Sequence, residues 1–183
     1  VQRIDSAGIF YYVNAGSTKQ KGVESYVSYE LIGNPRHFIN SAKLWMSHTL
    51  HDFHYGSFKQ LSADYSGKLL PAVPPTAVIA GFDLSTKAGL YLNVTYNYSD
   101  PVALNDANTA YATSYNLLGG RIGYRKVFHS KFRTEIFIAG DNLFDTRYSL
   151  GNDINAAAGR YFNSAPGRNF SAGVSLQWIK KPH

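Results

Sequence analysis

Alternation of apolar and polar side chains is the feature that most limits what this chain can fold into. Successive side chains on a β-strand point to opposite faces, so strict alternation gives one apolar and one polar face. The segment from Gly89 to Ser99 is the clearest case. One parity holds Leu90, Leu92, Val94, Tyr96 and Tyr98, and the other holds Tyr91, Asn93, Thr95, Asn97 and Ser99.

The same pattern recurs along the chain. Residues 169–178 repeat it, and further apolar parities occur at 78–84, 42–50 and 23–31. Segments 115–126 and 131–148 alternate less cleanly but are rich in Gly, Tyr, Ile and Phe. We find no ten-residue segment with a helical stripe. The sequence therefore predicts an all-β fold.

The connections between these segments alternate between short and long. Residues 33–36, 85–88 and 127–130 are short, whereas 51–74, 100–112 and 149–167 are long and rich in Gly, Asn, Asp, Pro and Ala. In an antiparallel up-and-down meander alternate connections lie at the same end, so one end carries turns and the other loops. To keep this order we interpret residues 8–31 as one bulged strand, which gives seven strands. An eighth exists if residues 1–14 form a separate strand.

Composition indicates that the apolar face meets lipid. Only 16% of residues are charged and 15% are aromatic, against roughly 25% charged in soluble domains. The polar parity is mostly Asn, Ser, Thr and Gly, which suits the wet interior of a large membrane barrel better than bulk solvent. A soluble β-sandwich or a lipocalin-like barrel is the alternative.

Other classes find less support. The net charge is +6, but the basic residues are scattered, and nucleic-acid binding is not expected. No stretch approaches the roughly 18 apolar residues of a transmembrane helix. The chain has no cysteine, which excludes disulfides and thiolate metal sites. No signal peptide opens the sequence, so for an exported protein we expect a processed or truncated piece.

Several motifs resemble those of TonB-dependent receptors, in the order in which that family has them. Ala139 to Gly151 (AGDNLFDTRYSLG) is similar to the penultimate-strand signature, with Asn142, Leu143, Phe144, Asp145 and Tyr148. Pro166 to Trp178, including Arg168, is similar to the last strand. Residues 14–24 and 70–74 resemble two further family patterns.

The signature itself has a physical interpretation. Asn and Asp bind nearby backbone groups and favour turns or bulges, so Asn142 and Asp145 should break the ladder where strand meets loop. Leu143 and Phe144 should pack against the wall. Phe170 and the closing Trp178 resemble the C-terminal signal read by the barrel assembly machinery, although 179–183 follow that tryptophan.

The resemblance implies the rest of the expected protein. Such receptors are outer-membrane barrels of about 22 strands with a plugged lumen. Residues 1–183 would then be the C-terminal segment, a multi-pass part of the Gram-negative outer membrane without the plug or the first strands. The implied function is energised uptake of a scarce nutrient, a ferric siderophore or other iron chelate, with the TonB complex as partner through the missing part.

Two groups are candidate ligand contacts in the long loops. His51, Asp52 and His54 carry metal-ligand side chains that a loop could bring together, whereas a strand would not. Arg160 and Tyr161 offer a cation and a flat ring to an anionic chelate. We assign the chain no resident metal or cofactor. Solvated loop residues are the plainer interpretation of both groups.

The sequence contains no catalytic set, since no nucleophile elbow, phosphate loop or carboxylate pair appears. We therefore expect no enzyme. The main alternative is a small passive porin or adhesin barrel of about eight strands, closed on itself. If the fragment is isolated, its two open sheet edges should favour self-association.

Overall fold

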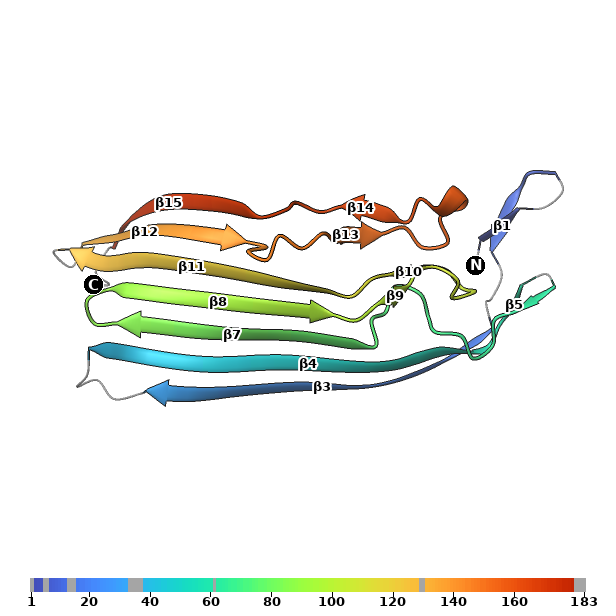
Figure 1. Cartoon of the computed structure of the whole chain (residues 1–183), viewed down its shortest axis with the longest axis horizontal. Helices are drawn as coiled ribbons and strands as arrows, with labels where there is room; N and C mark the ends of the chain where they lie inside the picture. The colour runs from blue at the N-terminus through green and yellow to red at the C-terminus, as the bar shows by residue number, and fades with distance from the viewer. Residues whose placement is uncertain are drawn as a thin grey trace.

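One open antiparallel sheet forms the body of the computed structural model, which describes residues 2–4, 7–12, 16–32, 38–60, 62–128 and 131–179. Its seven strands lie in chain order, so the predicted up-and-down meander is confirmed (Figure 1). They are β3 (Ser17–Ile32), β4 (Ile39–Ser57), β7 (Thr76–Thr86), β8 (Leu90–Ser99), β11 (Tyr115–Phe128), β12 (Phe132–Asp141) and β15 (Asn169–Trp178).

The predicted asymmetry between the two ends is also confirmed. Short connections join the strands at one end, here the turn end, and long segments join them at the other, the loop end (Figure 1). The loop end carries four small hairpins and a 3-10 turn. These are β1 (Gln2–Ile4) with β2 (Phe10–Tyr12), β5 (Lys59–Gln60) with β6 (Ala63–Asp64), β9 (Val102–Ala103) with β10 (Tyr111–Ala112), β13 (Ser149–Asn152) with β14 (Phe162–Ser164), and η1 (Ala157–Gly159).

The N-terminal prediction of a single strand over 8–31 is wrong. β2 pairs with β1 in a separate hairpin, and the long strand begins only at Ser17. Gly16 explains the break, because its φ of +87° is left-handed and a Cβ there would collide with the Ser57 carbonyl. The hairpin adds no eighth strand to the main sheet within the part that the structure describes.

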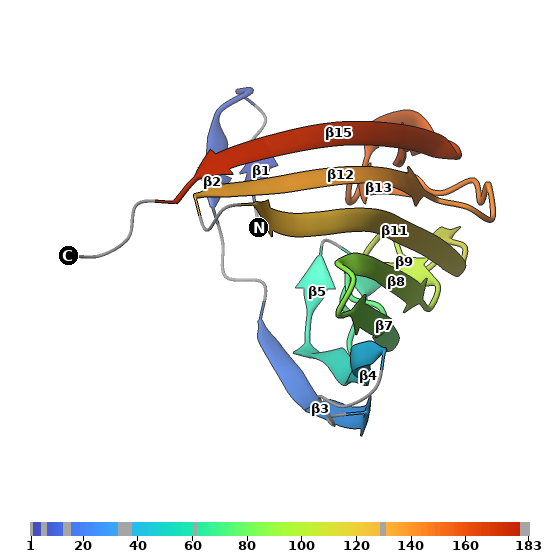
Figure 2. The same cartoon turned by 90° about the vertical axis from the view of Figure 1, so that its left-hand side faces the viewer.

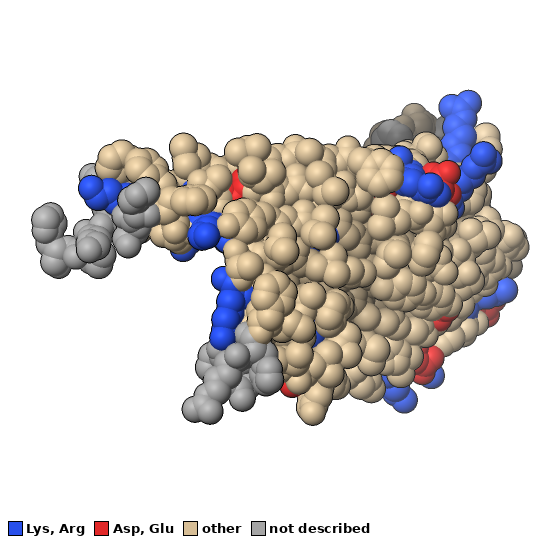
Figure 3. Space-filling model, turned by 60° about the vertical axis from the view of Figure 1, so that its left-hand side comes forward, with Lys and Arg blue, Asp and Glu red and all other residues tan. Residues whose placement is uncertain are grey.

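The register places the apolar parities of all seven strands on one side, here the apolar face. One row runs across Tyr29, Leu44, Phe82 and Val94, and another ends at Val174 and Ile136. These side chains are bare: Tyr29 is 67% and Val174 74% exposed. Figure 3 shows a broad surface of the molecule with few charged side chains, which gather toward its margins.

No second sheet covers the apolar face among the described elements, so the structure does not have the two-sheet core of a sandwich. The sheet curves as a single layer (Figure 2). The few fully buried side chains lie at the loop end, where Phe58 is 1% and Leu104 0% exposed. The described residues include no helix long and apolar enough to cross a membrane.

The two edge strands do not close the sheet. β3 pairs only with β4 and β15 only with β12 in the described part. Because an antiparallel meander of seven strands has an odd count, β3 and β15 run in the same direction, from the loop end to the turn end. They cannot form an antiparallel ladder with each other, so the closed small barrel is not formed here.

Candidate functional site

The polar parities meet on the other side of the sheet, here the polar face, and form rows across it. At mid-height the register aligns six consecutive strands in a single row of mixed charge. Its members are Lys43, Asp83, Asn93, Arg121, Ala139 and Ser171. The face therefore presents cations, carboxylates and amides side by side.

Hydrogen bonds fix part of this face. Asp83 accepts from the Trp45 indole (Nε1 to Oδ2, 2.9 Å) and from Asn93 (Nδ2 to Oδ1, 2.6 Å). Nearer the turn end, the Arg125 guanidinium donates to both carboxylate oxygens of Glu135, at 3.1 and 3.3 Å. The Tyr91 hydroxyl donates to the same carboxylate. These bonds hold Asp83, Glu135 and Arg125 in fixed positions.

Aromatic rings lie over glycines on the same face. Trp45 lies over Gly81, Tyr91 over Gly123, and Phe137 over Gly173, where a Cβ would stand 2.6 Å from the ring. Each pair is directly opposite in the register, so the missing side chain leaves room for the neighbouring ring. The rings give this face a smooth lining.

A groove of about 550 Å³ opens on the polar face. Arg121 lies in it with its guanidinium 3.8 Å from the centroid of the Phe137 ring, a cation–π contact. Amides, hydroxyls and one carboxylate surround it. They include Asn97, Thr95, Asp141, Asn169 and Ser171.

A second groove of about 350 Å³ lies toward the loop end. It is lined by Arg147 and Phe162, with the Tyr115 and Tyr148 rings packed 5.1 Å apart. Asn152 also lines it, and its buried Oδ1 has no hydrogen-bond partner in the described structure. Tyr148 borders both grooves, so they adjoin.

The three long loops are tied together rather than separate. The Tyr55 hydroxyl donates to Asp106 at 2.6 Å, and Asn108 exchanges hydrogen bonds with the Leu69 backbone at 2.7 and 3.0 Å. Asn155 reaches the same segment from the third loop, through Asp106 N (3.0 Å). Residues 100–112 therefore bind both neighbouring loops.

The Tyr55 hydroxyl, which lies at this junction beyond the ends of β7 and β8, is harder to ionise than that of an ordinary tyrosine. Burial of its ring and the hydrogen bond to the Asp106 carboxylate raise the pKa of the Tyr55 hydroxyl above its ordinary value. The Tyr55 ring also packs on buried Phe58, with centroids 4.6 Å apart. The neutral hydroxyl is thus part of the loop-end core.

The structure corrects the placement of the histidine group. β4 continues to Ser57, so His51, Asp52 and His54 lie on a strand and not in a loop. His51 therefore faces the opposite side from the other two, and its Nδ1 bonds the Pro74 carbonyl at 2.9 Å.

His54 is fully engaged by the protein. Its Nε2 bonds Asp52 at 2.7 Å and its Nδ1 bonds the Gly67 carbonyl at 3.1 Å, so neither nitrogen is free for a metal. No cluster of three or more metal-ligating side chains occurs in the described residues. The three residues stay candidates for ligand contact only.

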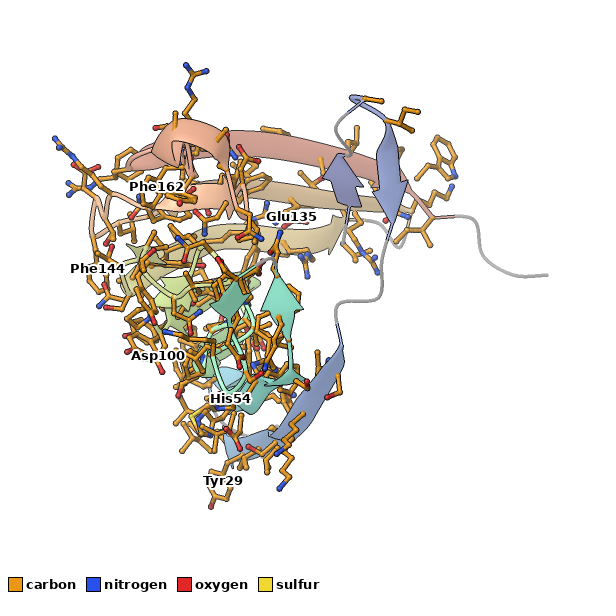
Figure 4. All side chains as sticks on the ribbon, turned by 90° about the vertical axis from the view of Figure 1, so that its right-hand side faces the viewer. Tyr29, His54, Asp100, Glu135, Phe144 and Phe162 are labelled. Atoms are coloured by element: carbon orange, nitrogen blue, oxygen red, sulfur yellow. The ribbon has the colours of Figure 1, made fainter. Side chains whose placement is uncertain are left out.

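Arg160 and Tyr161 lie in the last loop, after η1. Arg160 is exposed, whereas Tyr161 is half-buried and its hydroxyl accepts from Asn105 Nδ2 at 3.3 Å. Figure 4 looks at the loop end and shows His54 and Phe162, the neighbour of Tyr161, on different sides of it. The two predicted groups do not form one site.

The Asn142 motif forms a structural clasp between the end of β12 and the segments that follow it. Asn142 and Asp145 have left-handed φ values of 50° and 57° and end β12. Asn142 Nδ2 donates to the carbonyls of Thr146 (2.9 Å) and Pro166 (3.3 Å), and its Oδ1 accepts from Thr146 N (2.9 Å). The Asp145 carboxylate accepts from the backbone N of Arg168 at 2.9 Å.

The hydrophobic half of that motif departs from prediction. Leu143 packs over Gly140, but Phe144 is 52% exposed and is not packed against the wall. Phe170 and Trp178 are also exposed, on the apolar face, and Trp178 stacks edge-on against Phe132 at 4.9 Å. Their role as an assembly signal stays a prediction.

Sequence reasoning did not single out Arg121 or Arg147, although it named Asn142 and Tyr148, which also line the first groove. The polar parity of 89–99 signals Asn93 and Asn97, but β11 alternates too weakly to show which way Arg121 points. Arg147 lies outside any strand, so no periodicity applies to it.

Comparison with known proteins gives a consistent result. A family model described as "TonB dependent receptor-like, beta-barrel" matches residues 1–143. The fold is similar to the ferric citrate transporter FecA in its unliganded form, with 17% identity over 87% of this chain and TM-score 0.71. It is also similar to the siderophore receptor PiuA from Acinetobacter baumannii, with 22% identity over 96% of this chain and TM-score 0.66.

A third similar structure is the ferric yersiniabactin uptake receptor FyuA from Yersinia pestis, with 19% identity over 89% of this chain and TM-score 0.64. This chain covers only 24%, 23% and 24% of those three chains. The family and these neighbours are transport receptors of the outer-membrane β-barrel type and are not enzymes.

Proposed function

Because the chain belongs to the TonB-dependent receptor β-barrel family, we propose that it forms the C-terminal segment of an outer-membrane receptor for a ferric siderophore or another iron chelate. In this proposal the apolar face meets lipid and the polar face lines the lumen. The loop end faces outward and contributes to ligand capture. Coupling to the TonB complex belongs to other parts of the receptor.

The observation that carries the proposal is an exposed apolar face on one side of the sheet and a polar face on the other. Burying an exposed valine, leucine or isoleucine in hydrocarbon gains roughly 1.5–3 kcal/mol each. A sheet can cross lipid because its backbone groups pair along the ladder, provided its edges are also paired. In the receptor, further wall strands would pair with β3 and β15, and self-association of the isolated chain would use the same edges.

Uptake by such a wall needs binding and passage but no bond-breaking. The groups that the structure fixes on the polar face are hydrogen-bonding side chains and rings, which suit reversible contact with a polar chelate. We propose that the chain by itself does not transport. His51, Asp52, His54, Arg160 and Tyr161 remain proposed outer contacts.

Uptake of radioactive iron tests the proposal. The receptor that contains this chain would be expressed in a Gram-negative strain lacking its own iron receptors, and offered ferric citrate and a panel of ferric siderophores. We expect saturable uptake of at least one chelate that stops when the proton gradient is collapsed. Uptake that is linear in concentration and indifferent to the gradient would instead favour the passive porin.

A further inference from the structure

We propose that the polar face carries an anion track, in which Arg147 and Arg121 successively take the carboxylates of a negatively charged iron chelate. The inference rests on the proposed uptake function and names the charge class of the substrate. It is carried by two adjoining grooves that meet at Tyr148, each containing one arginine.

Arg121, in the groove farther from the loop end, can bind an anion because its guanidinium N–H donors are not engaged by the protein. Its guanidinium lies on the Phe137 ring at 3.8 Å, and no hydrogen bond or ion pair to it occurs in the described structure. Arg125, four residues on and facing the same way, is instead neutralised by Glu135. A planar guanidinium held on a ring keeps its edge free for a bidentate carboxylate.

The surroundings of Arg121 favour an anion over a cation. Asn97, Asn169 and Ser171 supply amide and hydroxyl donors around it. Asp83, the nearest carboxylate along its row, already accepts from Trp45 and Asn93.

Two carboxylates oppose an anion at this position. Glu135 interacts electrostatically with Arg121 but is already paired with Arg125. Asp141, by contrast, is unpaired in the described structure. It lines the same groove, two residues from Ala139, which is the direct cross-strand partner of Arg121. The Asp141 carboxylate has no hydrogen bond or ion pair in the described part of the chain. It would repel an anion, so neutralising Asp141 should strengthen anion binding while neutralising Arg121 weakens it.

Arg147 is the arginine that an incoming chelate would meet first. It is exposed in the groove near the loop end, and no partner occupies its guanidinium among the described residues. The paired Tyr115 and Tyr148 rings beside it give a chelate an apolar surface to lie on. Because Tyr148 also borders the groove that contains Arg121, a ligand can pass from one arginine to the other along the Tyr148 ring.

The test is equilibrium binding to the full receptor in detergent, with two probes of opposite kind. Ferric citrate is the anionic probe and an uncharged ferric trihydroxamate is the neutral one. The variants are Arg121→Gln, Arg147→Gln and Asp141→Asn. The matched control is Arg133→Gln, an arginine on the same face that lines neither groove.

We expect Arg121→Gln to weaken ferric citrate binding by about 10- to 100-fold, the loss of a charged hydrogen-bond pair. Arg147→Gln should weaken it less, because no ring contact holds the Arg147 guanidinium in the described structure, so binding an anion must also order that side chain. Asp141→Asn should tighten it several-fold. Arg121→Lys should recover part of the affinity, since it keeps the charge but not the fork. No variant should change the affinity for the neutral probe, and Arg133→Gln should leave the affinity for both probes unchanged.

Equal affinities of the wild type and Arg121→Gln for ferric citrate would overturn the track, and so would binding of the neutral probe alone. In either case energised iron uptake by the wild type would leave the proposed function standing. Absence of both binding and uptake of every chelate would reject the function as well. Circular dichroism of each variant checks that the barrel is folded.

Discussion

Replacing Asn142 with alanine tests whether the clasp between β12, the last loop and β15 holds this part of the wall. Asn142 is only 5% exposed, and its side chain makes three hydrogen bonds to the backbone of Thr146 and Pro166. Its φ of 50° lies in the left-handed region, which asparagine adopts at lower cost than alanine.

The expected cost follows from these contacts. Three hydrogen bonds at about 0.5–1.5 kcal/mol each sum to roughly 1.5–4.5 kcal/mol. The left-handed backbone adds about 1 kcal/mol for alanine. Thr146 and Pro166 are partly exposed, so water replaces some of the lost bonds. We therefore expect Asn142→Ala to lower the free energy of unfolding by about 2–4 kcal/mol.

Urea unfolding of the refolded receptor in lipid vesicles, followed by tryptophan fluorescence, measures this difference. Asn142→Gly should recover about 1 kcal/mol of the loss, because glycine adopts the same φ without strain. Asn116→Ala is the control, since the Asn116 side chain is exposed and has no hydrogen bond in the described structure. Equal stability of the two alanine variants would refute the clasp, and equal loss for alanine and glycine would remove the backbone part of the reasoning.

Three further predictions concern packing, medium and pH. Gly173→Ala should cost about 1–3 kcal/mol of unfolding free energy because its Cβ meets a ring at 2.6 Å; Gly151→Ala, with open space around it, should cost little. Val174→Arg should impair membrane insertion by about 2–4 kcal/mol, whereas Ser175→Arg on the polar face, opposite Glu135, should not; equal insertion of both would contradict lipid on the apolar face. The raised pKa of Tyr55 stabilises the loop end fully below about pH 10 and loses this contribution as the pH rises further. Tyr55→Phe should therefore open the loop end to protease at neutral pH and respond less to alkali.

The Asn142 motif shows where local reasoning succeeds. Asparagine and aspartate carry their hydrogen-bonding groups close to their own backbone, so the end of the ladder follows from the residues themselves. Phe144 shows where it fails. Whether a ring at that position packs or stays exposed depends on what lies beyond the turn, and the motif does not contain that information.

The histidine segment fails for a related reason. Residues 51–57 are polar enough to read as loop, yet they pair with Ser17 to Gly22 and extend β4. This pairing stabilises the segment as a strand, because it satisfies backbone donors and acceptors along both strands. Once on a strand, His51 and His54 take opposite faces, and the predicted cluster separates.

Alternation, turn length and the ladder-breaking tendency of Asn142 depend on neighbouring residues, so the seven-strand meander, its two ends and the apolar parity could be predicted from the sequence. Which side chains meet was decided only by the register between strands. Tyr91 reaches Glu135 across 44 positions of sequence, and Arg121 lies on Phe137 rather than on a carboxylate. A shift of two residues in either ladder would keep the apolar side chains on their face and still remove both contacts, so alternation alone does not fix that alignment.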